Sequence, residues 1–300
     1  MKIKLILSFL LLAGLTAACS SDSDDDSVNT LQLSFNNIEP LQNGFHFEGW
    51  AIVNGNALST GKFNVNANGE LVDLSGNVIA NGVFEVQEDI SASSTFVLTI
   101  EPAGDTDAIP AATHHVSGDF SNGEASLDLA HPSALGSDFS SATGTYILAT
   151  PTDDDPNNEN SGIWFLDNSS GSPQAGLSLP TLPDGWAYEG WAVYGGNAIS
   201  TGTFTSVSGA DASAPFSGPN AGPAYPGEDF VINAPSGIMF PIDLAGGMAV
   251  ISIEPVPDDS PAPYAFKPLA GGIPASATDR TPYSIPNNAN TLATGTARIN

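Results

Sequence analysis

Short runs of β-branched and aromatic residues, interrupted by Gly, Pro, Asn and Asp, recur along the chain after residue 18. Such runs predict β-strands separated by turns. In this part of the sequence no apolar face of helical period continues for about ten residues, so we expect no substantial helix. The pattern predicts an all-β fold of sandwich type. Representative strand-like runs are 95–100, 144–148, 162–166 and 248–253.

The pattern occurs twice. Residues 44–63 and 185–204, which start 141 positions apart, are identical at twelve of twenty positions. A duplication of this length indicates two related structural units. We therefore expect two tandem β-sandwich (Ig-like) domains, residues 31–152 and 161–300, joined by an acidic linker at 153–160.

The spacing between the copies grows along the chain. The apolar strand that ends in Glu-Pro recurs at Glu101 and Glu254, 153 positions apart, so the second copy has a net insertion of twelve residues. We assign the insertion to the Pro- and Gly-rich stretch at about 206–237 and expect an elaborated loop there. An Ala-Thr-Gly-Thr segment at 142–145 and 293–296 begins the last strand of each copy. We expect each copy to close on its own last strand.

Each duplicated segment predicts a β-hairpin, because an Asn-Gly or Gly-Gly pair separates its two strand-like halves. Strict alternation would place Phe47 and Trp50 on opposite faces of the first strand. We expect a β-bulge at Gly49 to shift the phase so that both reach the core, and Gly190 to act likewise in the second copy. Trp50 and Trp191 are then equivalent buried residues.

The N-terminus predicts export. Residues 1–18 combine a basic start, an apolar run too short to cross a bilayer and small residues before Cys19, which is typical of a lipoprotein signal peptide. We expect acylation at Cys19, the single cysteine, although an ordinary secreted protein is an alternative. Residues 19–30 predict a disordered acidic tether. Its aspartate run resembles the export signal of Bacteroidota surface lipoproteins, which implies an outer-membrane or cell-surface location.

The chain is strongly acidic, with 33 Asp and Glu against six Lys and Arg and a net charge of −27. Nucleic acid is excluded as a partner, because phosphate binding needs clustered basic residues. The same surface would repel anionic lipid, so we expect membrane attachment through the N-terminal lipid anchor alone.

Two sets of residues are candidate binding groups. The first set could offer oxygen ligands to Ca²⁺, although a solvated turn explains it as well, and no other cofactor is expected. The second set consists of residues from the inserted loop and of two tryptophans that have no tryptophan counterpart in the first copy. These residues could bind a sugar or a cation, although the loop could instead pack over its own domain. The first set is Asp153, Asp154, Asp155 and Glu159, and the second is Phe216, Tyr225, Glu228, Asp229, Trp164 and Trp186.

Catalysis is not expected. The acid pair Glu48 with Glu101, echoed by Glu189 with Glu254, could serve glycoside hydrolysis. Each Glu lies inside a repeated framework motif, however, where a hydrogen bond or a salt bridge explains it. No nucleophile elbow, phosphate-binding loop or dinucleotide fingerprint is present in the sequence.

The motifs around Trp50 and Trp191, with the strands that end at Glu101 and Glu254, resemble the extracytoplasmic C-terminal domain of the anti-sigma-K factor (RskA-like) family. The resemblance implies a sandwich-like exported sensor or ligand module. The sigma-binding domain and transmembrane helix of that family have no counterpart in this sequence. We expect a non-catalytic exported lipoprotein that binds an envelope protein or a glycan, or acts in structural display. The alternatives are envelope sensing related to anti-sigma regulation and a glycan-binding accessory role in polysaccharide uptake.

Overall fold

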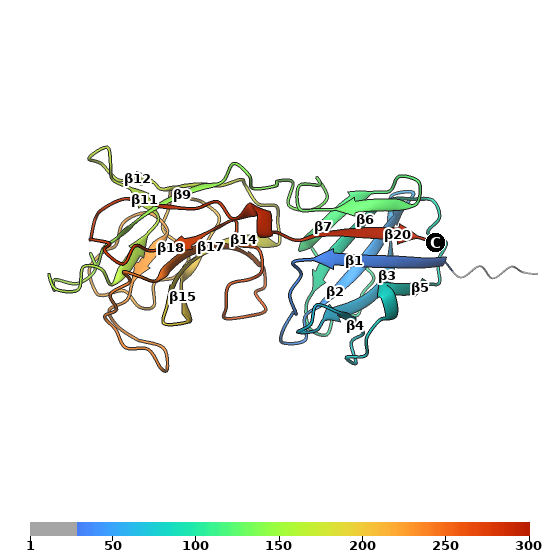
Figure 1. The fold of residues 1–300 in the computed structure, drawn as a ribbon, viewed down its shortest axis with the longest axis horizontal. Helices are drawn as coiled ribbons and strands as arrows, with labels where there is room; N and C mark the ends of the chain where they lie inside the picture. Colours follow the sequence, from blue (N-terminus) through green and yellow to red (C-terminus); the bar gives the residue numbers. More distant parts are fainter. Residues whose placement is uncertain (1–28) are drawn as a thin grey trace, which may run out of the picture.

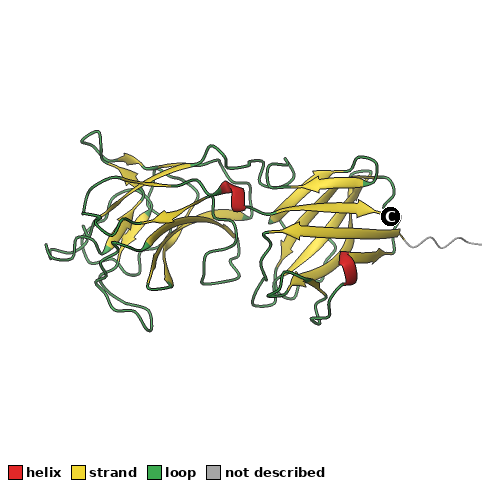
Figure 2. Cartoon of the chain, in the orientation of Figure 1, coloured by secondary structure: helices red, strands yellow, loops and turns green. Residues whose placement is uncertain are grey.

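The computed structural model describes residues 29–300, and this part of the chain is almost entirely β (Figure 2), which confirms the predicted fold class. Its helical elements are two single turns, η1 (Ala80–Gly82) and η2 (Ala289–Thr291). Among the described residues, no helix has the length and apolar character needed to cross a membrane. Cys19 and the predicted signal peptide and tether lie outside the described residues, apart from the first residues of β1.

The first unit contains two antiparallel sheets, with strand orders β4-β3-β2-β6-β7 and β5-β1-β20-β8. Its core lies between the two sheets and includes Phe47, Phe63 and Phe96. The strands are β1 (Asn29–Asn36), β2 (His46–Val53), β3 (Asn56–Val65), β4 (Leu71–Val72), β5 (Val83–Val86), β6 (Ser93–Glu101), β7 (His114–Asp119), β8 (Glu124–Leu127) and β20 (Thr294–Ile299).

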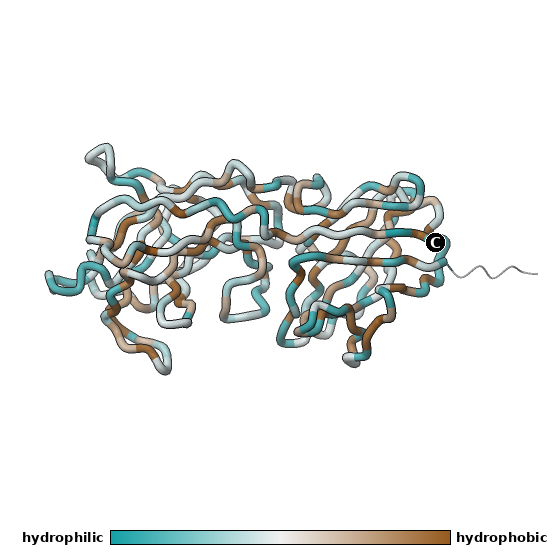
Figure 3. Tube along the Cα trace, in the orientation of Figure 1, coloured by the Kyte–Doolittle hydropathy of each residue, from teal (hydrophilic) through white to brown (hydrophobic). Residues whose placement is uncertain are grey.

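The second unit repeats this arrangement. One sheet has the order β15-β14-β17-β18, and in the other β9 is flanked by β10 and β19. Figure 3 shows apolar segments along the strands of both units. The strands are β9 (Thr143–Leu148), β10 (Gly162–Trp164), β11 (Leu166–Asp167), β12 (Gln174–Ala175), β13 (Leu177–Ser178), β14 (Trp186–Tyr194), β15 (Asn197–Phe204), β16 (Gly227–Asp229), β17 (Met248–Pro255), β18 (Leu269–Gly272) and β19 (Tyr283–Ile285).

The two units have exchanged their equivalent last strands. β20 comes from the end of the second copy but lies between β1 and β8 of the first unit. β9 comes from the end of the first copy but lies between β10 and β19 of the second unit. The expectation that each copy closes on its own strand is therefore wrong. Residues 153–160 connect β9 to β10 within the second unit and do not link the two units.

The chain thus crosses between the units twice, at 128–142 and 286–293. Both crossings are packed rather than extended in solvent: Phe139 and Leu292 are buried. The Asn287 side-chain amide donates a hydrogen bond to the Phe139 carbonyl at 2.9 Å, which ties one crossing to the other. The two crossings are therefore packed against the protein and connected to each other.

The two units lie end to end (Figure 1) and make direct contacts. The His115 ring of the first unit lies 4.4 Å from the Phe266 ring of the second, measured between centroids. Complete burial lowers the pKa of His115 to about 3, so its ring is uncharged at neutral pH. The Gln42 backbone N–H donates to the Asp259 carboxylate at 2.9 Å. The junction therefore combines an apolar contact with a hydrogen-bonded one.

Candidate functional site

The predicted bulge is present in each duplicated hairpin, but the extra residue belongs to the partner strand. β2 and β3 shift register between Gly49 and Trp50, which leaves Thr60 of β3 unpaired, and β14 and β15 shift in the same way at Gly190. β2 itself stays in continuous register with β6 over this stretch. Its side chains therefore alternate strictly, and Trp50 lies on the face opposite to Phe47. The expectation that the bulge turns both residues to one core is wrong.

Trp50 and Trp191 are nevertheless buried at equivalent positions, with exposed fractions of 1% and 2%, as predicted. Each indole N–H donates to a hydroxyl on the neighbouring strand. Trp50 Nε1 lies 2.9 Å from Thr99 Oγ1, and Trp191 Nε1 lies 2.7 Å from Ser252 Oγ. The duplicated signature thus forms a buried polar layer on the outer face of each sheet.

A glutamate extends this layer in both copies. Thr99 donates to Glu101, and Ser252 donates to Glu254. The same carboxylate oxygen accepts the backbone N–H ten residues further along the chain, at 2.9 Å in both copies. The two glutamates therefore fix the loop that follows β6 or β17 over the outer face. This accounts for the recurring Glu-Pro strand end in structural terms.

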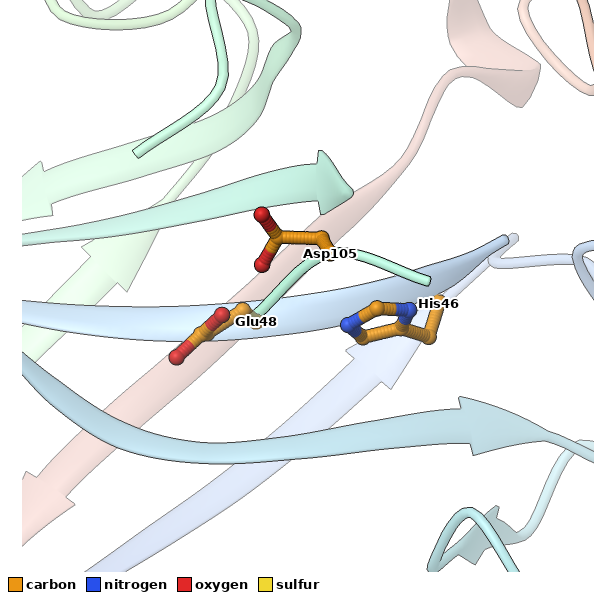
Figure 4. A group of neighbouring side chains, drawn as sticks. All are labelled: His46, Glu48 and Asp105. Carbon is orange, nitrogen blue, oxygen red and sulfur yellow. The ribbon is translucent and has the colours of Figure 1, made fainter. Parts of the chain in front are cut away.

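In the first unit this layer contains a cation. Lys62 Nζ lies 3.3 Å from a Glu48 oxygen and 2.8 Å from an Asp105 oxygen. The hydrogen bond from Lys62 lowers the pKa of Asp105 below its ordinary value. Ser59 donates to the other Glu48 oxygen. Figure 4 shows Glu48 and Asp105 beside His46, and ligand atoms of all three lie within 4.8 Å of one another. The lysine thus sits between the two carboxylates and offsets one of their two charges.

The second unit keeps the carboxylates and lacks the cation. Oxygen atoms of Glu189, Glu254 and Asp258 lie within 4.8 Å of one another. Thr203 is the cross-strand partner of Glu189, the place that Lys62 takes in the first unit. We call this group of three acids the second-unit carboxylate cluster.

Two acids of this cluster have raised pKa values. Burial raises the pKa of Glu189 to about 7 and that of Glu254 to about 8. Both side chains are buried, and Oε2 of each receives no hydrogen bond from the described part of the chain. Ser200 donates to the other oxygen of Glu189. Each carboxylate therefore has one oxygen that is hydrogen-bonded to the framework and one buried oxygen without a hydrogen bond.

The acidic residues predicted to bind calcium lie in the β9–β10 loop and have separate partners. Asp153 and Asp155 accept hydrogen bonds from within the loop, Asn220 donates to Asp154 at 3.3 Å, and Glu159 forms an ion pair with Arg280 at 2.9 Å. The two groups of converging acids and histidines found among residues 29–300 do not include them. Calcium binding by this loop stays a prediction.

Two predicted ligand residues on the inserted stretch face inward. Glu228 and Asp229 are completely buried. Glu228 accepts the backbone N–H groups of Phe216 and Ser217, and Asp229 accepts the N–H of Thr152 at 2.9 Å. Burial raises the pKa of Glu228 to about 8. Both carboxylates therefore hold the inserted loop against its own unit, which is the alternative considered for this loop.

The aromatic candidates are also engaged within the protein. Phe216 packs against Phe240 with ring centroids 5.4 Å apart, and the half-buried Tyr225 donates its hydroxyl to the Pro173 carbonyl. Trp164 and Trp186, which the sequence suggested as candidate sugar-binding residues, are each only 3% exposed and offer a ligand almost no surface. Trp164 lies beneath Gly222 of the inserted loop, and Trp186 stacks on Phe266 at the junction of the units.

Comparison of the chain with protein-family models, with curated proteins and with solved structures finds no match. The resemblance to the anti-sigma-K factor domain therefore stays a prediction from sequence motifs. Function has to be argued from the arrangement of the two units and from their carboxylate clusters.

Proposed function

We propose that this protein is a non-catalytic, lipid-anchored module of the cell envelope that displays its second unit at a distance from the membrane. The observation that carries the proposal is the position of Asn29 and Asn300, the two ends of the described segment. β1 begins beside the end of β20, where the Asn300 N–H donates to the Thr30 carbonyl at 2.9 Å. Both ends lie at the outer end of the first unit, and the second unit extends away from them (Figure 1).

A tether that leads into β1 would thus approach the first unit from the side opposite to the second unit. An acyl chain on Cys19 would hold that side toward the bilayer. The second unit, with the inserted loop, would be the part most accessible to an envelope protein or a glycan.

The two chain crossings support a rigid connection between the first unit and the displayed second unit. A single linker between domains permits relative rotation by default. Here two chain segments cross the junction, and the contacts of Asp259 with Gln42 and of His115 with Phe266 add to them. Such a junction keeps the second unit in a defined orientation, which suits a binding or structural display role better than a flexible sensor.

Replacing Cys19 with Ala is expected to release the protein from membranes, because the change removes the proposed acylation site. The measurement is fractionation of cells that express either form, with metabolic labelling by a fatty acid. Ser20→Ala is the matched control and should leave both labelling and attachment unchanged. A Cys19→Ala protein that stays on the membrane after a high-salt wash would contradict the anchor.

Replacement of Asp24, Asp25 and Asp26 by Ala should keep membrane attachment but reduce cleavage of the protein by external protease.

A further inference from the structure

We propose that Glu189, Glu254 and Asp258 form a calcium site in the second unit, at the position equivalent to the Lys62 ammonium of the first unit. The site is independent of membrane anchoring, so it extends beyond the display function. The donor atoms indicate the class of ion, and the buried oxygens indicate where it binds. The comparison of the two copies indicates that positive charge is needed at this position.

The geometry of the cluster fits one hard cation. Calcium takes oxygen ligands at about 2.3–2.6 Å, so two ligands of the same ion are at most about 5 Å apart. The three carboxylates offer oxygens within 4.8 Å of one another. Carboxylate oxygens without imidazole or thiolate favour calcium or magnesium over zinc and copper. Calcium is the better match, because its flexible coordination tolerates ligands that come from both a sheet and a loop. Magnesium demands near-ideal octahedral geometry.

The buried oxygens point to a ligand independently of the acidic grouping. Glu254 is 1% exposed, and its Oε1 already accepts the Ser252 hydroxyl and the Tyr264 N–H. Its Oε2 and that of Glu189 are buried without a donor from residues 29–300. When both groups are ionised, a buried carboxylate oxygen without a partner is costly and the two charges repel each other. A cation between them removes both costs.

The first unit shows what this scaffold requires. Its counterparts of Glu189 and Asp258 are Glu48 and Asp105, and Lys62 Nζ contacts both of them. Thr203, at the lysine position, has no charge and is too short to bridge the acids. The same carboxylate framework therefore holds a lysine ammonium in one copy and, by our inference, a bound ion in the other.

Asp258 makes the site accessible from solvent and connects it to the junction of the two units. It is exposed on the loop after β17, and one of its oxygens accepts the Ser260 N–H at 2.9 Å. The next residue, Asp259, accepts the Gln42 N–H of the first unit. An ion held by Asp258 would thus stiffen the segment that contacts the first unit, and calcium should also strengthen the junction.

The test is calorimetric titration of the purified full chain with CaCl₂ after treatment with EDTA, with MgCl₂ as the comparison ion. We expect one calcium ion per chain with a Kd on the order of 10⁻⁴–10⁻³ M, as in extracellular calcium modules. Calcium at about ten times Kd should raise the midpoint of thermal unfolding by about 3–5 °C. Magnesium should bind at least about tenfold more weakly.

Two variants decide whether the ion occupies this cluster. Asp258→Asn changes an exposed ligand and should weaken calcium binding at least about tenfold. Thr203→Lys restores the lysine of the first unit and should abolish the calcium response, with an unfolding midpoint no lower than that of the calcium-free parent. If Thr203→Lys does not fold, Asp258→Asn decides alone. The matched control is the double variant Asp153→Asn and Asp155→Asn, which should bind calcium like the parent.

Three results would overturn the proposal. The first is the absence of any calcium-dependent heat or stabilisation in the parent protein. The second is unchanged calcium affinity in Asp258→Asn, or in a folded Thr203→Lys. The third is loss of binding in the Asp153→Asn and Asp155→Asn control alone, which would assign calcium to the β9–β10 loop.

Discussion

Deletion of residues 294–300 is expected to unfold the first unit and to leave the second unit folded. These residues contain β20, which pairs with β1 on one side and with β8 on the other. Their loss removes an interior strand, so about eight to ten backbone hydrogen bonds disappear at about 0.5–1.5 kcal/mol each. The expected cost of roughly 4–15 kcal/mol is comparable to the whole stability of an ordinary domain.

The readout is hydrogen exchange measured by segment in the parent and in the deletion variant. Amides of β1, β2 and β8 should lose protection, whereas amides of β10, β14 and β19 should keep it. A fold in which each copy kept its own last strand predicts the reverse, because the same deletion would then remove a strand from the second unit. Protection lost in β10 and β19 and retained in β1 and β8 would contradict the exchange.

Truncation of Trp50 to Ala is expected to lower the free energy of unfolding by about 3–5 kcal/mol. The indole is almost completely buried between the outer face of its sheet and the covering loop, and its N–H is bonded to Thr99. Removal leaves a cavity in a layer that the surrounding strands cannot close, and it also leaves the Thr99 hydroxyl without its donor. Urea unfolding of the first unit, followed by circular dichroism, gives the difference.

Trp50→Phe is the matched control, because it keeps most of the ring volume but removes the N–H. It should cost less than Trp50→Ala by the cavity contribution, and the lost hydrogen bond should account for about 0.5–1.5 kcal/mol. Trp191→Ala should reproduce the large effect in the second unit. A loss below about 1 kcal/mol for Trp50→Ala would mean that the buried layer does not stabilise the sheet.

The sequence was sufficient to predict the fold class, the burial of the two repeated tryptophans and the position of the bulge. These features depend on local alternation and on the duplicated segments. The partner of each last strand was not predictable, because both strands begin with the same Ala-Thr-Gly-Thr segment and either could pair with β1 or β10. The exchanged pairing goes together with contacts between distant segments, such as the hydrogen bond from the Asn287 side chain to the Phe139 carbonyl, which the sequence pattern does not reveal.

The candidate site was predictable only in part. The recurring glutamates were visible in the sequence, but their convergence with Asp258 depends on two strands and a loop that meet only in the folded protein. Two signals were present in the sequence. Lys62 is replaced by Thr203 within the duplicated segments, and an Asp follows four residues after the Glu of each Glu-Pro pair. Glu228 and Asp229 were misjudged because the acidic character of a loop does not reveal that its carboxylates hold backbone amides.

The exchange of the last strands is tested most directly by disulfide cross-linking in a Cys19→Ala background, where two introduced cysteines are the only thiols. Ser34 of β1 is paired with Thr296 of β20. Paired antiparallel residues have Cα atoms about 4.5–5.5 Å apart, which suits a disulfide. Thr145 of β9 is the repeat equivalent of Thr296 and would face Ser34 if no exchange occurred. We expect Ser34→Cys with Thr296→Cys to form an intramolecular disulfide, detected by peptide mapping, and Ser34→Cys with Thr145→Cys to remain reduced. A disulfide in the second pair and none in the first would contradict the exchanged fold.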